Sequence, residues 1–173
     1  MRILAGAICL FTLVIVTSAL YRMDLYQEAY GMTRLRLVVT TFELWLGLVF
    51  VLLLVAGIRL RATWMPRLVV GSAVATLFGL VAINPDAYIA DRNVARFEAT
   101  GKIDTSYLST LSADAVPALM TLPEPERSCA LRLLAADLAE ADPWPAYNVS
   151  RQSARTVLAA GSVRDAGLHC IVR

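Results

Sequence analysis

Residues 37–58 read LVVTTFELWLGLVFVLLLVAGI, an apolar stretch in which Glu43 is the one ionisable side chain. A helix needs roughly 20 mostly apolar residues to cross about 30 Å of hydrocarbon. Residues 3–20 and 68–83 form two further apolar stretches, of which the second is somewhat short. The sequence therefore predicts an all-α membrane protein with three spanning helices, at residues 3–20, 37–58 and 68–83.

The composition excludes several classes of protein. Hydrophobic residues make up 58% of the chain and charged residues only 17%, a balance that a soluble domain of this length would struggle to shield from water. The net charge of +2 is too small to indicate a nucleic-acid partner, and the arginines cluster beside the apolar stretches, at the depth of lipid headgroups. We expect the partners to be the lipid bilayer, other transmembrane helices or envelope proteins.

The chain divides at about Asn84, into a transmembrane domain at residues 1–83 and a helical tail at residues 84–173. Within the first part, residues 21–30 have no loop character, so the first helix should continue to Tyr30 and stop at Gly31. Thr33 is a suitable cap for a second helix that runs to about Arg59. The two helices would form a hairpin whose tip stands roughly 15 Å clear of the membrane.

The tail opens with Asn84, Pro85 and Asp86, a strong signal for the start of a helix with Asn84 as its cap. This helix should stop near Gly101, and its apolar residues Ala87, Ala90, Val94 and Phe97 fall at helical spacing. Further short helices are expected at residues 105–111, 113–120, 124–140 and 146–160. No alternating strand pattern is present in the sequence, so the tail is predicted to be all-α.

Glu43 is the first candidate site, because an ionisable group inside a membrane span costs about 2.5–3.5 kcal/mol. Arg36, Thr40 and Glu43 form a polar stripe with Gly47, at helical spacing along the second helix. The expected arrangement is a structural ion pair between Arg36 and Glu43 near the end of the span. The alternative is a proton or ion pathway lined by the same two side chains.

Gly71, Ala75 and Gly79 are the second candidate site. They lie four residues apart in the third span and leave a flat face that lets another helix approach closely. We expect a helix of the same chain to occupy this face.

Motifs for catalysis or cofactor binding are missing from the sequence. There is no glycine-rich phosphate loop, nucleophile elbow or zinc-protease motif, and Cys9, Cys129 and Cys170 have no metal-ligand spacing. His169 lacks a second histidine or an acid in a recognisable motif. The tail carboxylates occupy ordinary cap and helix-end positions: Asp114, Asp137, Glu140 and Asp142. We therefore predict no catalytic, cofactor or metal residues and expect the protein not to be an enzyme.

Five blocks carry a resemblance to a known family: EAYGMTRLRL at 28–37, NPDAYIADRNV at 84–94, GKIDTSYL at 101–108, LSADAVPAL at 111–119 and NVSR at 148–151. Together they resemble the C-terminal part of a family of polytopic membrane proteins of bacterial, actinobacterial type, classed only as a domain of unknown function. The resemblance extends from about residue 20 to 160 and brings no catalytic residues. Members of the family are usually longer, so the chain resembles a terminal fragment or a short form.

The leading hypothesis is a structural or interaction component of the bacterial envelope, located in the cytoplasmic membrane. The alternative is part of a transporter or ion-coupled channel in which Glu43 and Arg36 line a polar path. Residues 3–20 are expected to remain as a span, although Thr17 and Ala19 also suit a cleaved signal peptide.

The orientation in the membrane follows from the loop at residues 59–67, whose arginines directly abut two spans. We expect this loop to be cytoplasmic and the tail to be outside, although the raw count of positive charges favours the reverse. An outside tail would permit a disulfide between Cys129 and Cys170.

Overall fold

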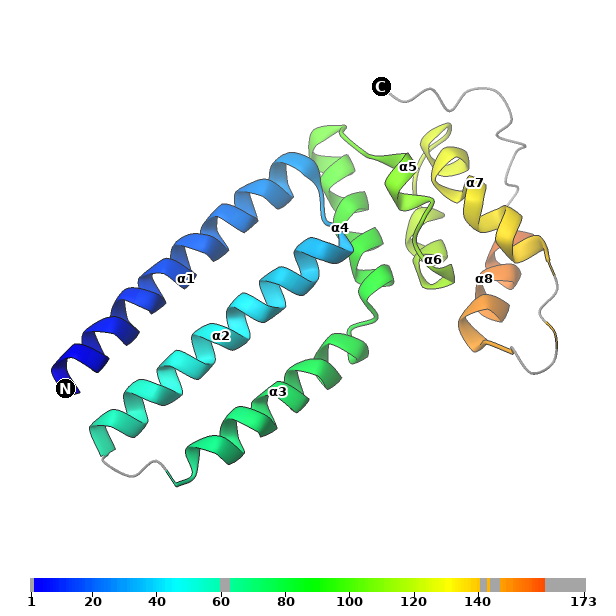
Figure 1. Cartoon of the computed structure of the whole chain (residues 1–173). Helices are drawn as coiled ribbons and strands as arrows, with labels where there is room; N and C mark the ends of the chain where they lie inside the picture. The colour runs from blue at the N-terminus through cyan, green and yellow to red at the C-terminus, as the bar shows by residue number, and fades with distance from the viewer. Residues whose placement is uncertain (1, 60–62, 141–142, 144–146, 161–173) are drawn as a thin grey trace. The chain divides into compact units, whose positions relative to one another are not determined.

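The computed structural model describes residues 2–59, 63–140, 143 and 147–160, and these residues contain helices and loops but no strand. The predicted all-α fold class is confirmed. The chain divides into two compact units, Met1–Ile83 and Asn84–Arg173, which are described separately below (Figure 1).

The first unit is a layer of three long helices (Figure 1). These are α1 (Arg2–Tyr30), α2 (Arg34–Arg59) and α3 (Met65–Ala82). α2 lies in the middle and packs along α1 on one side and α3 on the other. Successive helices run in opposite directions, so α1 and α2 form the predicted hairpin.

Local chemistry explains where these helices begin and end. At the end of α1, Gly31 has a φ of 81° and its N–H donates to the Gln27 carbonyl at 2.8 Å, as expected of a glycine stop. The Thr33 hydroxyl accepts the Arg36 N–H at 3.3 Å and so caps α2. α3 begins at Met65, about one turn earlier than predicted, because Pro66 suits the first turn of a helix.

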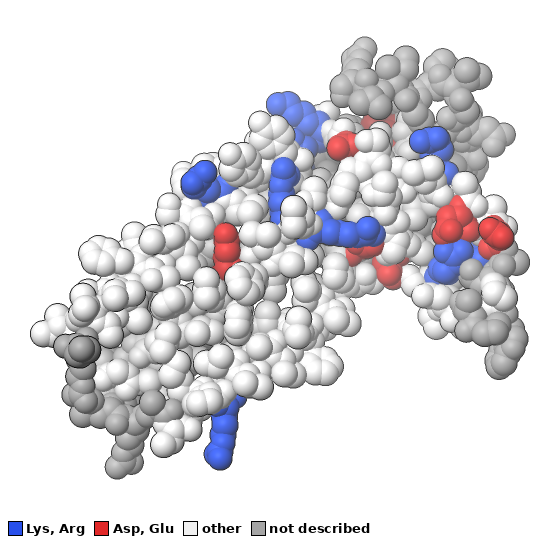
Figure 2. All heavy atoms as spheres, in the orientation of Figure 1, with Lys and Arg blue, Asp and Glu red and all other residues white. Residues whose placement is uncertain are grey.

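All three helices are long and apolar enough to cross a membrane. Their large apolar side chains point outward: Ile3 is 90% exposed, Phe78 71% and Val81 74%. On the face shown in Figure 2, few charged side chains lie along most of their length. Such a surface is stable only in lipid, so the chain is a membrane protein.

The second unit packs several shorter helices around one apolar core. They are α4 (Pro85–Thr100), α5 (Thr105–Leu108), the 3₁₀ helix η1 (Ala113–Ala115), α6 (Val116–Leu119), α7 (Glu126–Ala139) and α8 (Val149–Ala160). α4 packs on η1 and α6, α5 packs on α7, and α6, α7 and α8 contact one another. Less than 2% of each of the largest core side chains is exposed: Ile89, Leu108, Val116, Leu119, Leu122 and Leu131.

Several tail helices are shorter than predicted, each for a local reason. The single helix expected at 113–120 is divided into η1 and α6, because Pro117 cannot donate a hydrogen bond and crowds the carbonyl of Ala113. The helix expected from residue 105 to 111 ends at Leu108. α8 begins at Val149 because the Asn148 side chain accepts the N–H groups of Ser150 and Arg151, at 2.8 and 3.2 Å.

Both ends of α4 lie where the sequence placed them, but the predicted role of Asn84 is wrong. Gly101 ends the helix with a φ of 68°. Asn84 has a φ of 51° and its side chain makes no capping hydrogen bond to α4. Instead it donates to the carboxylate of Asp114, a partner distant in sequence. The buried face of α4 contains Ile89, Ala90 and Val94, together with two polar side chains, Asp86 and Asn93.

Candidate functional site

The polar stripe of α2 faces α1. Gln27 of α1 donates a hydrogen bond from Nε2 to the Thr40 hydroxyl at 3.2 Å. About two helical turns further into the span, a Cβ atom placed at Gly47 would lie 3.4 Å from Val16 Cγ1. Glu43 lies between these two contacts on the same stripe, so its side chain enters the α1–α2 interface.

The predicted ion pair between Arg36 and Glu43 is wrong. The Arg36 guanidinium donates from Nη1 to the Gly31 carbonyl and lies over the Tyr30 ring, 5.8 Å from its centroid. Arg36 and Glu43 are separated by about 10 Å of helix. The carbonyl groups at the end of α1 lack helical partners and lie much closer to Arg36, so they compete successfully for this cation.

Glu43 is left with a buried and unpaired oxygen. Its Oε2 is shut off from solvent and has no hydrogen-bond partner among the residues that the structure describes. Counting about 20 residues back from Ile58 puts the hydrocarbon edge near Val39, so Glu43 lies roughly 6 Å inside it. An unsatisfied carboxylate oxygen at this depth is costly, which makes Glu43 the strongest candidate for a functional residue in the membrane.

The small-residue face of α3 is open rather than packed. Gly71, Ala75 and Gly79 are exposed, and no described atom lies within 4 Å of a Cβ placed at Gly71 or Gly79. The expectation that a described helix of this chain occupies the face is therefore wrong. α3 meets α2 through another face, where Trp45 Nε1 donates to the Ser72 hydroxyl at 3.2 Å.

We predict that replacing Gly47 with Leu destabilises the α1–α2 hairpin, whereas replacing Gly71 with Leu does not. A Cβ atom at Gly47 would already touch Val16 at van der Waals distance, so the larger side chain of leucine should push the helices apart, and such overpacking typically costs about 1–3 kcal/mol. The same leucine at Gly71 enters open space. Thermal unfolding of the two variants in detergent measures the difference. An equal loss of stability in both would show that the Gly71 face is covered.

A polar cluster in the tail joins segments that are far apart in sequence. Asp114 accepts hydrogen bonds from the hydroxyl groups of Ser150 and, at 3.2 Å, Ser112. The Ser112 N–H in turn donates to Asp86 Oδ2 at 2.7 Å. Together with Asn84, these contacts tie the start of α4, the start of η1 and the first turn of α8 to one another.

Burial raises the pKa of Asp114, but hydrogen bonds from Ser150, Asn84 and Ser112 together outweigh it, and the pKa lies below its ordinary value. A carboxyl group with a lowered pKa in the folded state stabilises the fold at neutral pH. That contribution is lost as the pH falls through the lowered value, below about pH 4. The cluster therefore acts as a structural tie at neutral pH.

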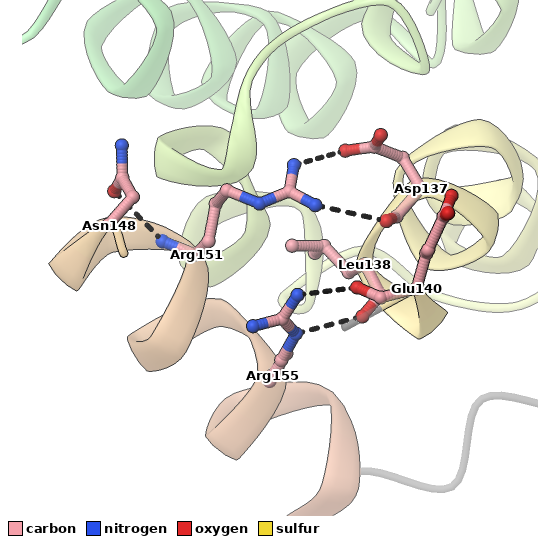
Figure 3. A network of polar contacts seen from close by, with 6 residues as sticks. All are labelled: Asp137, Leu138, Glu140, Asn148, Arg151 and Arg155. Carbon is pink, nitrogen blue, oxygen red and sulfur yellow. Dashed lines mark hydrogen bonds and ion pairs between the residues drawn. The ribbon is translucent and has the colours of Figure 1, made fainter. Parts of the chain in front are cut away.

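Two arginines of α8 complete the end of α7 (Figure 3). Arg151 forms an ion pair with Asp137 and also donates to the Asp137 carbonyl, at 3.1 Å. Arg155 donates to the carbonyls of Leu138 and Glu140, at 2.9 and 2.6 Å. The last carbonyls of a helix lack helical partners, so these arginines satisfy them and fix α8 against α7.

From the sequence, Asp114, Asp137 and Glu140 were considered one at a time. Arg151 and Arg155 were not identified as the residues that bind near them. The NVSR block at 148–151 was the available signal, since it contains the cap of α8, a ligand of Asp114 and the partner of Asp137. No group of three potential metal ligands occurs within the described part of the chain. Asp142, His169 and Cys170 lie outside the described residues.

Residues 1–122 match the family model described as Domain of unknown function (DUF4153). No curated protein and no solved structure matches the chain. The match begins before residue 20 and ends at Leu122, so the NVSR block lies beyond it. Because it covers most of the chain, including all three membrane helices, the predicted membership is confirmed: this chain belongs to the DUF4153 family of domains of unknown function.

Proposed function

We propose that this protein is a structural or interaction component of the bacterial cell envelope and not an enzyme. In this proposal, α1–α3 anchor it in the cytoplasmic membrane, and the tail offers a folded surface to other envelope proteins on the outer side. The observation that carries the proposal is that the paired charges of the tail bind within the tail. Asp86, Asp114, Asp137, Arg151 and Arg155 each bind a neighbouring segment of the tail itself.

The state of Cys129 supports the outside orientation. Cys129 is disulfide-bonded, whereas Cys9, in the first span, is free. Structural disulfides persist in oxidising compartments and are rare in the cytosol. This supports a tail outside the cytoplasm and a cytoplasmic loop between α2 and α3.

A matched pair of cysteine variants tests the orientation in intact cells. Ala99→Cys places a thiol at an exposed position of α4, and Thr63→Cys places one in the loop before α3. A membrane-impermeant thiol reagent should label Ala99→Cys at once and Thr63→Cys only after the membrane is opened, with the wild-type chain as background. The reverse order of labelling would put the tail in the cytoplasm.

The interaction role is tested by purifying the native complex in mild detergent. We expect an envelope protein to co-elute at a fixed ratio and to cross-link to the tail. Reversing the charge of an exposed tail residue outside the internal contacts, such as Glu98→Lys, should shift that ratio while the tail stays folded. A protein that elutes alone in mild detergents and cross-links to nothing contradicts the proposal.

The unpaired Oε2 of Glu43 favours a second candidate, transport of a proton or cation. In that case Glu43 would bind the proton or cation and pass it to polar groups on other helices. Flux into proteoliposomes that is present in the wild type and lost in Glu43→Gln would replace the first proposal with this one. An absence of flux in both proteins is the result expected of an interaction component.

A further inference from the structure

The helix α8 contributes little to the apolar core of the tail. Ala154 is its one buried residue within the described part of the chain, and Val149 is 73% exposed. The largest fully buried side chains among the described residues come from the segment between Pro85 and Ala139. Because the burial of large apolar side chains is the main source of a domain's stability, α8 gains less from the core than α7 does.

Two arginines provide much of the contact between α8 and α7 (Figure 3). Arg155 donates to the carbonyls of Leu138 and Glu140, at 2.9 and 2.6 Å. Arg151 pairs with Asp137, and the Asp137 side chain is 64% exposed. Water and salt reach such a pair and screen it. The attachment of α8 to α7 therefore depends largely on polar groups at the surface of the tail.

The first turn of α8 is also held by a polar contact, from the Ser150 hydroxyl to the carboxylate of Asp114. Polar contacts contribute less net stability than their number suggests, because water replaces each of them when it breaks. The contact between α8 and the rest of the tail should therefore be the first to open.

Once detached, α8 should not remain helical. It has 12 residues, and an isolated helix of that length is marginal in water, even for sequences rich in alanine. Detachment should therefore expose the backbone N–H groups of α8 to solvent, where their hydrogens exchange with those of water.

We propose that α8 is a releasable arm of the tail, which detaches and unwinds as a unit while α4–α7 stay folded. Proteins open in such cooperative parts, the least stable first. Release of the arm frees the carboxylates of Asp114 and Asp137, together with the last carbonyls of α7, for other hydrogen-bond donors. The tail thus has a second form, with a group of acceptors that α8 covers while it is bound.

Hydrogen exchange of the full chain in lipid nanodiscs, followed by mass spectrometry, distinguishes release of the arm from unfolding of the tail. The oxidised protein is used, so that Cys129 keeps its disulfide during labelling. After correction for intrinsic rates, the amides of α8 should exchange at least about tenfold faster than the slowest amides of α4 and α7.

Paired variants test the cause of the difference. Arg155→Gln removes two hydrogen bonds from a charged donor and should speed the exchange of α8 about tenfold, with α4 unchanged. Arg132→Gln, at an exposed arginine of α7, should change neither helix. Leu131→Ala weakens the core and should speed the exchange of α4, whereas α8, which exchanges through release, should keep its rate.

Two results would overturn the proposal. If α8 exchanges as slowly as α4 in the wild type, and Leu131→Ala speeds both helices equally, then α8 opens only when the whole tail unfolds. If the exchange of α8 in Arg155→Gln equals that of the wild type, then the contacts of this arginine with α7 do not hold the arm.

Discussion

The Glu43→Lys variant should fail to accumulate in the membrane, whereas Glu43→Gln should accumulate like the wild type. Glu43 enters the α1–α2 interface, and no described residue offers its Oε2 a hydrogen bond. A lysine there carries its charge into the interface, on the same stripe as Arg36. The intramembrane charge costs about 2.5–3.5 kcal/mol, and forcing a longer side chain between packed helices adds about 1–3 kcal/mol. Glutamine keeps the size of Glu43 and is never charged.

Leu35→Lys is the control for this prediction. Leu35 is 73% exposed near the start of α2, where a lysine reaches the headgroups and should be tolerated. Immunoblots of membrane fractions compare the three variants. Normal accumulation of Glu43→Lys would contradict the enclosed position of Glu43 between the two helices.

The Leu131→Ala variant should lose much of the stability of the tail. Leu131 is fully buried in α7, and replacing a buried leucine with alanine costs about 2–5 kcal/mol. The total stability of a domain is about 5–15 kcal/mol. Limited proteolysis of the full chain in detergent, across a denaturant series, should show the tail cleaved at a clearly lower midpoint.

Leu133→Ala gives the matched comparison, because Leu133 lies on the same helix but is 44% exposed. Its effect should stay within about 0.5 kcal/mol, as for most surface substitutions. Equal midpoints for the two variants would mean that α7 does not belong to the folded core. The result also bears on the extent of the domain, since Leu131 lies beyond the residues that match the family model.

The sequence predicted the long helices well, because their signals are local or need only lipid as a partner. The apolar runs, the Gly31 stop and the Thr33 cap all lie within a few residues of the structure that they determine. The short tail helices were less well predicted, since Pro117 interrupts a pattern that otherwise fits one helix.

The candidate site was predicted only in part. Helical spacing placed Thr40 and Glu43 on one stripe, but it could not show that the Gly31 carbonyl competes for Arg36. In the same way, Asn84 has the sequence of a cap and instead binds Asp114. In both cases the side chain binds a partner other than the one that its position in the helix predicts: Arg36 binds a carbonyl at the end of the preceding helix, and Asn84 binds a carboxylate that is distant in sequence.

The flat arrangement of α1, α2 and α3 limits what this membrane unit can do by itself. Helices that stand in a row have two outer surfaces and no lumen, so the described part of the unit encloses no water-filled conduit. Any solute that passed Glu43 would need a second wall, built from helices other than these three. Whether the protein conducts a solute therefore depends on how it assembles. The number of copies of this chain, and the other helices bound to it in the bilayer, should be determined before any flux is measured.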